Sequence, residues 1–384
     1  MNKKLVVRAR KAIPQGVARK LWVKSGGRCQ YDGCNIPLWK DSLMQKDLNK
    51  SYISHIVAAS EDGPRGDVIL SQQLETNFDN LLLLCDECHR RIDKREVESH
   101  TRKSLTEMKI KQERNIELLT SLTPDKKSQI VSFTSKIGSF EPIVKFEDCI
   151  HAILPDYYPV SDNIIQLGTS NLAIKDNKAG YWEIHSNQLE EMVKQHIKPL
   201  INQEKKPHFS VFALAPQPLL IKLGTLIPEL SISEIYQFHR EPKQSWKWSN
   251  EEDSIEVNLI EPTEILSNAV LVISLSDNVT DDRIFNTLGN DVSIWKITVA
   301  SPNRNVLKNR QTLINFKNQV RNAYSKIKLQ YSMNNSIHVF PVMPNSCAIE
   351  TGRVWMEKAD LSLIIYDQNS TNNGFSKTIE IKNQ

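Results

Sequence analysis

The sequence predicts two parts of different fold class, an N-terminal α+β part built around a metal and a larger C-terminal α/β part. Four of the six cysteines fall within the first ninety residues, in two pairs. From about residue 145 onward, short β-rich runs alternate with helical segments. A Ser- and Lys-rich stretch between them is typical of a linker. We therefore predict domains at residues 1–122 and 145–384, joined by a linker at 123–144, which suits a chain of 384 residues.

The composition indicates a cytoplasmic protein without a membrane partner. Hydrophobic residues make up 40% of the chain and charged residues 24%, which is ordinary for a soluble protein. The longest aliphatic runs, such as Leu81–Leu84, are far shorter than the about 20 residues of a membrane-spanning helix. Cytoplasmic thiols stay reduced, so the cysteines do not predict a disulfide framework. Cys149 and Cys347 stand alone, and we expect them to be buried as small hydrophobic residues.

Positive charge is concentrated at the start of the chain. The net charge is +4, yet residues 1–40 contain ten Lys or Arg and one acid, Asp32. Such a basic segment suits a polyanionic partner. An ordinary solvated charged face explains it equally well.

Two cysteine pairs predict a structural zinc site in the N-terminal part. Cys29 and Cys34 are separated by four residues, and about fifty residues later Cys85 and Cys88 are separated by two. This spacing is typical of a tetrahedral zinc held by four thiolates. The metal would join two distant loops where the hydrophobic core is small. The part closes with a helix predicted over residues 104–122, where apolar residues recur at helical spacing.

Histidine and asparagine residues lie in a characteristic order among these cysteines. His55 is on the β-like stretch 52–60, a Gly/Pro loop follows, Asn80 precedes a strand of leucines, and His89 begins a helix. Across about residues 18–95 this order resembles the HNH endonuclease family in its zinc-stapled ββα-metal form. The resemblance implies that His55 is the general base, that Asn80 orients it, and that His89 binds a catalytic Mg²⁺ or Mn²⁺. This chemistry suits hydrolysis of a phosphodiester, which needs a base for water and a cation for the leaving oxygen.

One position departs from the family pattern. Many HNH sites have Asp or His immediately before the base, whereas this chain has Ser54. The catalytic cation would then be weakly held, or completed by water or by Asp93, one helical turn after His89. Asp93 is alternatively an exposed helix carboxylate. Its basic neighbours suit contacts with DNA phosphates, and we predict as DNA-binding residues Arg90, Arg91, Lys94 and Arg95.

Alternating strands and helices in the C-terminal part predict parallel α/β sheets. Strands are expected at 208–216, 269–276, 292–300, 337–344 and 361–367, and helices at 219–230, 309–328 and 348–359. The sequence pattern of residues 212–230, 235–248 and 338–367 resembles that of the SAVED domain. That resemblance covers about residues 145–384 and implies a cyclic-oligonucleotide sensor of two fused Rossmann-like halves, similar to the CRISPR-associated CARF sensors. HNH followed by SAVED is the layout of an effector nuclease in CBASS, the cyclic-oligonucleotide anti-phage signalling systems.

Residues near strand ends are the candidates for ligand binding, because ligands of such sheets bind beyond the carboxyl ends of the strands. Two strand–loop–helix turns could present backbone N–H groups to a phosphate, and two tryptophans spaced as on a strand could stack on a base or pack in the core. The candidates are Gln217, Pro218, Trp246, Trp248, Ser274, Ser276, Asn345 and Ser346.

The resulting hypothesis is a ligand-activated, metal-dependent endonuclease. A cyclic di- or trinucleotide would bind the C-terminal sensor, and the family resemblance implies that binding drives homo-oligomerisation and largely non-specific cleavage of double-stranded DNA. Two alternatives remain open. One is a restriction-type nuclease whose C-terminal domain recognises modified DNA, and the other is a non-catalytic zinc-stapled DNA-binding sensor in which Ser54 marks a dead metal site.

Overall fold

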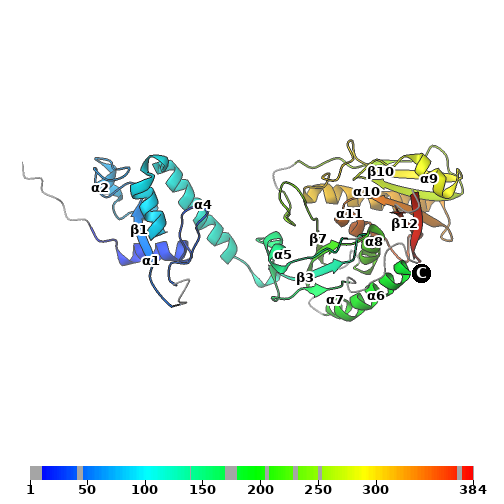
Figure 1. The fold of residues 1–384 in the computed structure, drawn as a ribbon, viewed down its shortest axis with the longest axis horizontal. Helices are drawn as coiled ribbons and strands as arrows, with labels where there is room; N and C mark the ends of the chain where they lie inside the picture. Colours follow the sequence, from blue (N-terminus) through cyan, green and yellow to red (C-terminus); the bar gives the residue numbers. More distant parts are fainter. Residues whose placement is uncertain are drawn as a thin grey trace, which may run out of the picture. The chain divides into compact units, whose positions relative to one another are not determined.

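The computed structural model divides the chain into two compact units, Met1–Leu122 and Thr123–Gln384. It describes residues 11–40, 46–138, 140–168, 180–203, 207–227, 232–249, 253–369 and 374–383 (Figure 1). The end of the first unit coincides with the domain boundary predicted at residue 122. Lys3, Lys4, Arg8 and Arg10 of the basic N-terminal segment lie outside the described residues.

A two-stranded antiparallel sheet forms the centre of the N-terminal unit. Strand β1 (Ser51–His55) pairs with β2 (Leu81–Cys85), so that His55 lies opposite Leu81 and Ser51 opposite Cys85. All five residues of β2 are buried, which explains its unbroken run of leucines, since neither face of this strand meets solvent. The helical elements of the unit are α1 (Gln15–Lys24), α2 (Leu70–Leu74), η1 (Phe78–Asn80), α3 (Asp86–Arg90), the π-helical turn η2 (Arg91–Arg95), η3 (Val97–Ser99) and α4 (Arg102–Thr120).

The hydrophobic core of this unit is small. It is formed by Leu21, Cys29, Leu38, Ile56, Leu81, Leu82, Leu83, Leu84, Cys85, Cys88, Ile92 and Leu105. Three of these residues are cysteines of the predicted zinc site. A unit with so small a core depends on further cross-links for its folding stability.

The C-terminal unit begins with a parallel sheet in the order β4–β3–β6–β7, in which β5 also pairs with β3. The strand β3 (Lys127–Thr134) is central, so the linker predicted at 123–144 is wrong over those residues. The strand is mostly buried because it pairs with β4, β5 and β6, although its serines suggested a linker. The other elements are η4 (Pro124–Lys126), α5 (Phe146–Ile153), β4 (Tyr158–Pro159), β5 (Ile165–Gln166), α6 (Tyr181–His196), α7 (Lys198–Ile201), β6 (His208–Leu214), α8 (Gln217–Leu226) and β7 (Ser233–Tyr236).

A second sheet follows in the order β13–β12–β11–β9–β10–β8. Its four inner strands are parallel, and β8 and β13 are antiparallel edge strands. The elements are β8 (Asn258–Ile260), β9 (Asn268–Ser274), α9 (Asp281–Leu288), β10 (Val292–Thr298), α10 (Arg310–Gln330), β11 (Ser336–Val342), α11 (Asn345–Arg353), β12 (Ser362–Asn369) and β13 (Gly374–Ile381). Two sheets with covering helices agree with the predicted α/β class. The helix predicted at 348–359 is wrong beyond Arg353, where the chain forms turns.

Helices α8 and α11 join the two sheets through a contact between their backbones. A Cβ atom on Gly224 of α8 would lie 2.0 Å from the carbonyl oxygen of Ile349, and one on Gly352 of α11 would lie 1.9 Å from that of Ile221. Only glycine permits such an approach. Each helix follows a strand of a different sheet, β6 and β11, so this contact fixes one half of the unit against the other (Figure 1).

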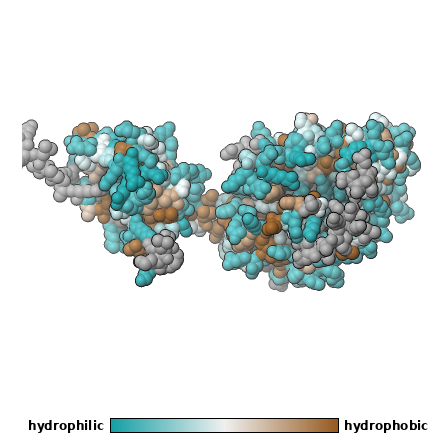
Figure 2. Space-filling model, viewed as in Figure 1, coloured by the Kyte–Doolittle hydropathy of each residue, from teal (hydrophilic) through white to brown (hydrophobic). Residues whose placement is uncertain are grey.

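On the face in view, the surfaces of both units are mainly hydrophilic, with scattered hydrophobic side chains (Figure 2). Such scattering is normal for protein surfaces. Within the described ranges, none of the helices combines the length and the apolar character that crossing a membrane requires.

We predict that Gly352→Ala or Gly224→Ala destabilises the C-terminal unit strongly. The added methyl group would overlap a backbone carbonyl, which cannot move aside like a flexible side chain. The expected loss is about 3 kcal/mol or more, measured by chemical unfolding of the whole chain. Gly16→Ala is the matched control, since a Cβ there meets nothing within 4 Å. Equal stability of the control and of the Gly352 variant would show that the two helices separate easily.

Candidate functional site

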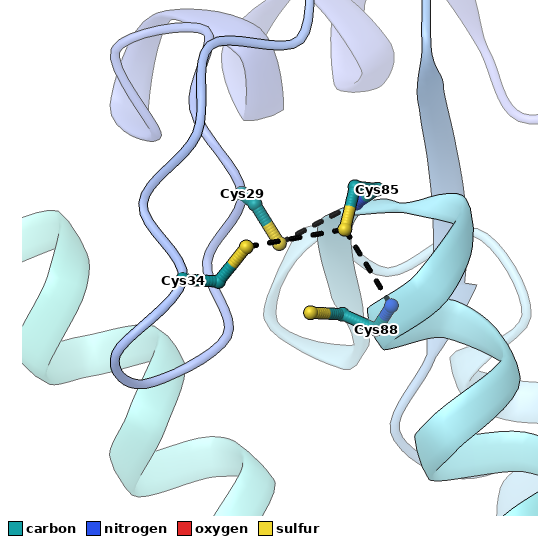
Figure 3. Close-up of side chains that lie close together, drawn as sticks. All are labelled: Cys29, Cys34, Cys85 and Cys88. Atoms are coloured by element: carbon teal, nitrogen blue, oxygen red, sulfur yellow. Dashed lines mark hydrogen bonds between the residues drawn. The ribbon is translucent and has the colours of Figure 1, made fainter.

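Four cysteine side chains converge in the N-terminal unit (Figure 3). The sulfur atoms of Cys29, Cys34, Cys85 and Cys88 all lie within 4.8 Å of one another, and those of Cys34 and Cys85 are 3.9 Å apart. Sulfurs that bind one zinc ion at about 2.3 Å are separated by about 3.8 Å in a tetrahedron. The cluster therefore fits a structural zinc, which would tie the 29–34 loop to the end of β2.

Local backbone features hold the thiols in place. Gly33 and Asn35 adopt positive φ angles of 81° and 49°, values that Gly and Asn tolerate best, and they fold the loop around Cys34. Cys85 caps helix α3, where its sulfur accepts from the N–H of Cys88 at 3.5 Å. The sulfur of Cys29 accepts from the N–H of Cys85 at 3.4 Å. These bonds bring sulfurs from two distant segments together.

The thiols differ in how readily they ionise. Burial raises the pKa of Cys29 to about 12 and also raises the pKa of Cys88. Burial opposes ionisation of Cys85 as well, but donation from Cys88 and the neighbouring thiols leaves the pKa of Cys85 below its usual range. Because four thiolates so close together would repel one another, a cation is needed to stabilise them together.

His55 ends strand β1 and is only 6% exposed. Its Nε2 atom lies 2.8 Å from the carbonyl oxygen of Glu75. A carbonyl can only accept, so Nε2 carries a hydrogen, and Nδ1 of the neutral ring is the acceptor. The predicted base thus has a defined tautomer, with Nδ1 as the atom that can take a proton.

Asn80 fixes the backbone that follows His55. Its Oδ1 accepts from the N–H of Val57 at 2.7 Å, and its Nδ2 donates to the carbonyls of Val57 at 2.9 Å and Leu74 at 3.1 Å. The amide therefore joins the end of β1 to the start of β2. Asn80 thus contacts the backbone two residues after His55 and makes these bonds to Val57 and Leu74.

His89 and Asp93 lie side by side. The Nε2 of His89 is 3.2 Å from Oδ2 of Asp93, while Oδ1 of Asp93 accepts from Arg65 at 2.6 Å. The ring of His89 also stacks on Tyr52 of β1, with centroids 4.9 Å apart. Asp93 is 22% exposed on its side chain, so it is neither a fully exposed helix carboxylate nor unpaired.

This pair suits a divalent ion, although it supplies few protein ligands. A nitrogen and an oxygen 3.2 Å apart are spaced like neighbouring ligands of one octahedral ion. Beyond the cysteine cluster, the described residues contain no other group of three or more His, Cys, Asp or Glu arranged for a metal. Ser54 shares a strand face with Tyr52, and its buried hydroxyl has no hydrogen-bond partner among the residues that the structure describes. Water and substrate oxygens would complete the shell, as is common for Mg²⁺.

The predicted DNA-binding residues are partly neutralised by acids on the same surface. Arg90 pairs with Asp86 at 2.9 Å, and Arg95 pairs with Glu87 at 2.7 Å. Arg91 lies within 4.0 Å of both Glu87 and Glu96, and Lys94 is exposed. These are surface pairs of small net energy, so the arginines can exchange an acid for a phosphate.

In the C-terminal unit, two predicted ligand-binding side chains join the two halves instead. Nε2 of Gln217 donates to the carbonyl of Met343 at 2.9 Å, and Nδ2 of Asn345 donates to that of Ala213 at 3.4 Å. Each helix N-terminus thus reaches the strand end of the other half. Neighbouring Pro218 is buried in α8, and the Ser346 hydroxyl donates to Gln237 at 2.9 Å.

The predicted tryptophans lie on no strand and are buried. Trp246 is 2% exposed and packs against Phe212 and Phe238, which is the core packing that the alternative expects. Trp248 is 5% exposed. The hydroxyl of Ser274 bonds within its own turn, to Asp277 and Val279, whereas the backbone N–H of Ser276 donates to the carbonyl of Val342 at 3.0 Å. Hydrogen bonds within turns or between the two halves therefore engage most of the polar residues that were predicted to bind the ligand.

A cavity of about 410 Å³, here called the His239 cavity, lies beyond the carboxyl ends of β7, β10 and β11. Arg304 and Lys308 place positive charge on it, and Phe238 offers a ring. Burial, and secondarily the charge of Lys308, lower the pKa of His239, so its ring is neutral near pH 7. The lining residues are Gln237, Phe238, His239, Glu241, Pro242, Arg304, Asn305, Leu307, Lys308 and Pro344.

Sequence reasoning missed this cavity, although its signal was present. Residues 237–239 directly follow the short strand β7, which was not among the predicted strands. A second cavity of about 480 Å³ lies at the amino ends of β6 and β7. This second cavity contains two ion pairs, Arg310 with Glu234 and Arg353 with Glu350. Because ligands of α/β sheets bind beyond the carboxyl ends of the strands, the His239 cavity is the better candidate for a ligand site.

Comparison with known families identifies the C-terminal unit. Residues 189–381, just over half of the chain, match the model described as "SMODS-associated and fused to various effectors sensor domain", or SAVED. The chain therefore belongs to the SAVED family. This confirms the predicted class of the C-terminal α/β domain. No curated protein matches the chain.

Several solved structures are similar to the chain at low identity. The Acinetobacter baumannii Cap4 SAVED/CARF-domain containing receptor with the cyclic trinucleotide 2'3'3'-cAAA has 13% identity and a TM-score of 0.43, covering 81% of this chain and 61% of that one. The same receptor with 3'3'3'-cAAA has 14% identity and a TM-score of 0.41, with the same coverage. The Moraxella osloensis Cap4 receptor has 11% identity and a TM-score of 0.42, covering 82% and 66%. The chain thus spans 61% of the length of the Acinetobacter receptor.

We predict that the protein purifies with one zinc ion per chain, bound at the cysteine cluster. Cys29→Ser should abolish this zinc and unfold the N-terminal unit, because the small core depends on the cross-link. Elemental analysis and two-step thermal unfolding measure both effects. Cys149→Ser is the control for loss of a buried thiol elsewhere, since Cys149 lies in the C-terminal core. Full zinc content in the Cys29 variant would contradict a four-thiolate site.

Proposed function

We propose that the chain is a cyclic-oligonucleotide-activated, metal-dependent DNA endonuclease that acts as an effector of CBASS anti-phage defence. Membership of the SAVED family is the observation that carries the proposal. A sensor domain described as fused to various effectors calls for an effector in the other unit. The N-terminal unit would be that effector, and its cysteine cluster and its buried histidine of defined tautomer support this assignment.

The activating ligand would bind in the His239 cavity. Its volume of about 410 Å³ falls within the range of about 300–1,000 Å³ that is usual for small-molecule sites. The phosphodiesters of a cyclic di- or trinucleotide are anionic, which suits Arg304 and Lys308 at the rim. Phe238 provides a ring on which a base can stack. Part of a trinucleotide would occupy the cavity while the rest lies over its rim.

The proposed reaction is hydrolysis of a DNA phosphodiester. His55 would take the proton of an attacking water at Nδ1, while Nε2 stays bound to the Glu75 carbonyl and holds the ring. Attack forms a phosphorus–oxygen bond, and the bond to the leaving sugar oxygen breaks, with that oxygen taking a proton from solvent. A divalent ion at His89 and Asp93 would stabilise negative charge on the leaving oxygen. Arg90, Arg91, Lys94 and Arg95 would position the duplex through its phosphates.

Gating would act through assembly. Ligand binding to the sensor would promote homo-oligomers that bring nuclease units together on double-stranded DNA. A requirement for two units suits cleavage of two strands, and it keeps single chains inactive.

The first prediction of this proposal concerns cleavage. Plasmid DNA with Mg²⁺ should be cut only when one member of a panel of cyclic di- and trinucleotides is present, and His55→Ala should reduce the rate by at least 100-fold. His151→Ala is the matched control, because His151 is exposed on α5. Cutting without any ligand would favour the restriction-type nuclease. Binding of DNA and ligand without any cutting would favour a non-catalytic sensor.

A second prediction concerns the cavity. Arg304→Glu and Lys308→Glu should each weaken binding of the activating nucleotide by at least ten-fold, because the reversed charge repels phosphate. Calorimetry measures the affinity, and zinc content should remain unchanged. Lys328→Glu, at an exposed position near the end of α10, is the control for charge alone. Unchanged affinity in both cavity variants would place the ligand elsewhere.

A further inference from the structure

Arg65 makes an unusual set of contacts in the N-terminal unit. Its Nε donates to the carbonyl of Ile56 at 2.8 Å, and its Nη1 donates to that of Ile92 at 2.7 Å. Its Nη2 donates to Oδ1 of Asp93 at 2.6 Å and lies 3.4 Å from the carbonyl of His55. The side chain is only 7% exposed. All three guanidinium nitrogens are therefore engaged inside the protein.

These contacts join the two segments that carry the candidate catalytic groups. Ile56 and His55 lie at the end of β1, whereas Ile92 and Asp93 belong to η2, which continues directly from the helix of His89. Among the described residues of the unit, β1 pairs with β2, and no strand pairing joins it to η2. The guanidinium thus forms a direct bridge between the base and the His89–Asp93 pair.

The loop that presents Arg65 is built under tight constraints. Arg65 has a φ angle of 60°, which a non-glycine residue adopts only with strain. A Cβ on Gly66 would lie 2.2 Å from the carbonyl oxygen of Glu61, so this position requires glycine. From α4, Arg102 donates to the carbonyls of Arg65 at 3.1 Å and Gly66 at 2.9 Å. Backbone strain of this kind is often found at functional sites. The strained loop, held by a second arginine, therefore indicates a functional role for the position of Arg65.

We propose that Arg65 is a positioning residue of the nuclease site. It fixes the distance between His55 and the His89–Asp93 pair, and it occupies Oδ1 of Asp93, so that Oδ2 and Nε2 of His89 would be the atoms that hold a cation. This inference rests on the proposed endonuclease function. Lysine cannot replace it, because one ammonium group cannot span acceptors on both segments as a planar fork does. Groups that orient metal ligands commonly affect metal affinity or activity by about 10–100-fold.

The test compares Arg65→Lys with the wild-type full chain, with the cysteine site filled with zinc beforehand. Lysine keeps the positive charge, so a change in Mn²⁺ affinity reports geometry rather than electrostatics. Mn²⁺ titration followed by electron paramagnetic resonance should show about ten-fold weaker binding. With activating nucleotide, kcat for plasmid cleavage should fall about 10–100-fold, while KM for DNA stays within about two-fold because the buried Arg65 cannot touch the duplex.

Two further variants keep the outcome interpretable. Arg114→Lys, at an exposed position on α4, should match wild type in every assay. If Arg65→Lys loses zinc and fails to fold, Arg102→Lys replaces it, since it loosens the loop without touching the pair. A smaller change in the same direction, in both kcat and Mn²⁺ affinity, is then expected.

Wild-type kcat and Mn²⁺ affinity in a folded Arg65→Lys protein would overturn the proposal. So would a raised KM for DNA with unchanged kcat, which would mark Arg65 as a DNA contact. Absence of cleavage by wild type with every nucleotide would instead contradict the proposed function. The Mn²⁺ titration would still decide whether Arg65 orders His89 and Asp93.

Discussion

The contact between α8 and α11 constrains the whole C-terminal unit. Gly224 and Gly352 bring the helix backbones so close that no side chain can stand between them. Each helix follows a central strand of a different sheet, so the contact sets the relation of the two sheets. The reciprocal bonds of Gln217 and Asn345 then become possible, because each helix N-terminus lies against the other half's strand end. The position of the His239 cavity follows from this arrangement.

The N-terminal unit has a small core, yet its candidate site requires fixed side-chain positions. Hydrophobic packing forms a short buried sheet, and contacts of polar groups and thiols hold the segments around it in place. Cysteines join the 29–34 loop to β2, Asn80 joins the end of β1 to the start of β2, and Arg65 joins β1 to η2. Each cross-link ends at or beside a candidate catalytic residue. Stability and site geometry therefore depend on the same few contacts.

Local sequence patterns predicted the structure well wherever a residue type has one dominant structural role. Cysteine spacing predicted the cluster, and alternating strands and helices predicted the α/β class, because both signals are short in range. The roles of serine and glutamine are harder to predict from sequence, because their polar groups can bond within turns, across interfaces or to ligands. Gln217 and Ser346 bond protein partners that lie more than a hundred residues away. The serines of β3 are typical of a linker by composition, and they become buried through pairing with β6, about eighty residues further along the chain.

The stiffness of the α8–α11 contact also limits how the sensor can respond to a ligand. A hinge between the two halves would require the glycine contact to open, which would leave backbone groups unpacked. The wall of the His239 cavity spans both halves, since Gln237 follows β7 and bonds Ser346 of α11. Under the proposed function, a ligand in this cavity would thus contact both halves at once. The close glycine contact then favours a response in the loops at 237–242 and 304–308 over a rotation of the two halves.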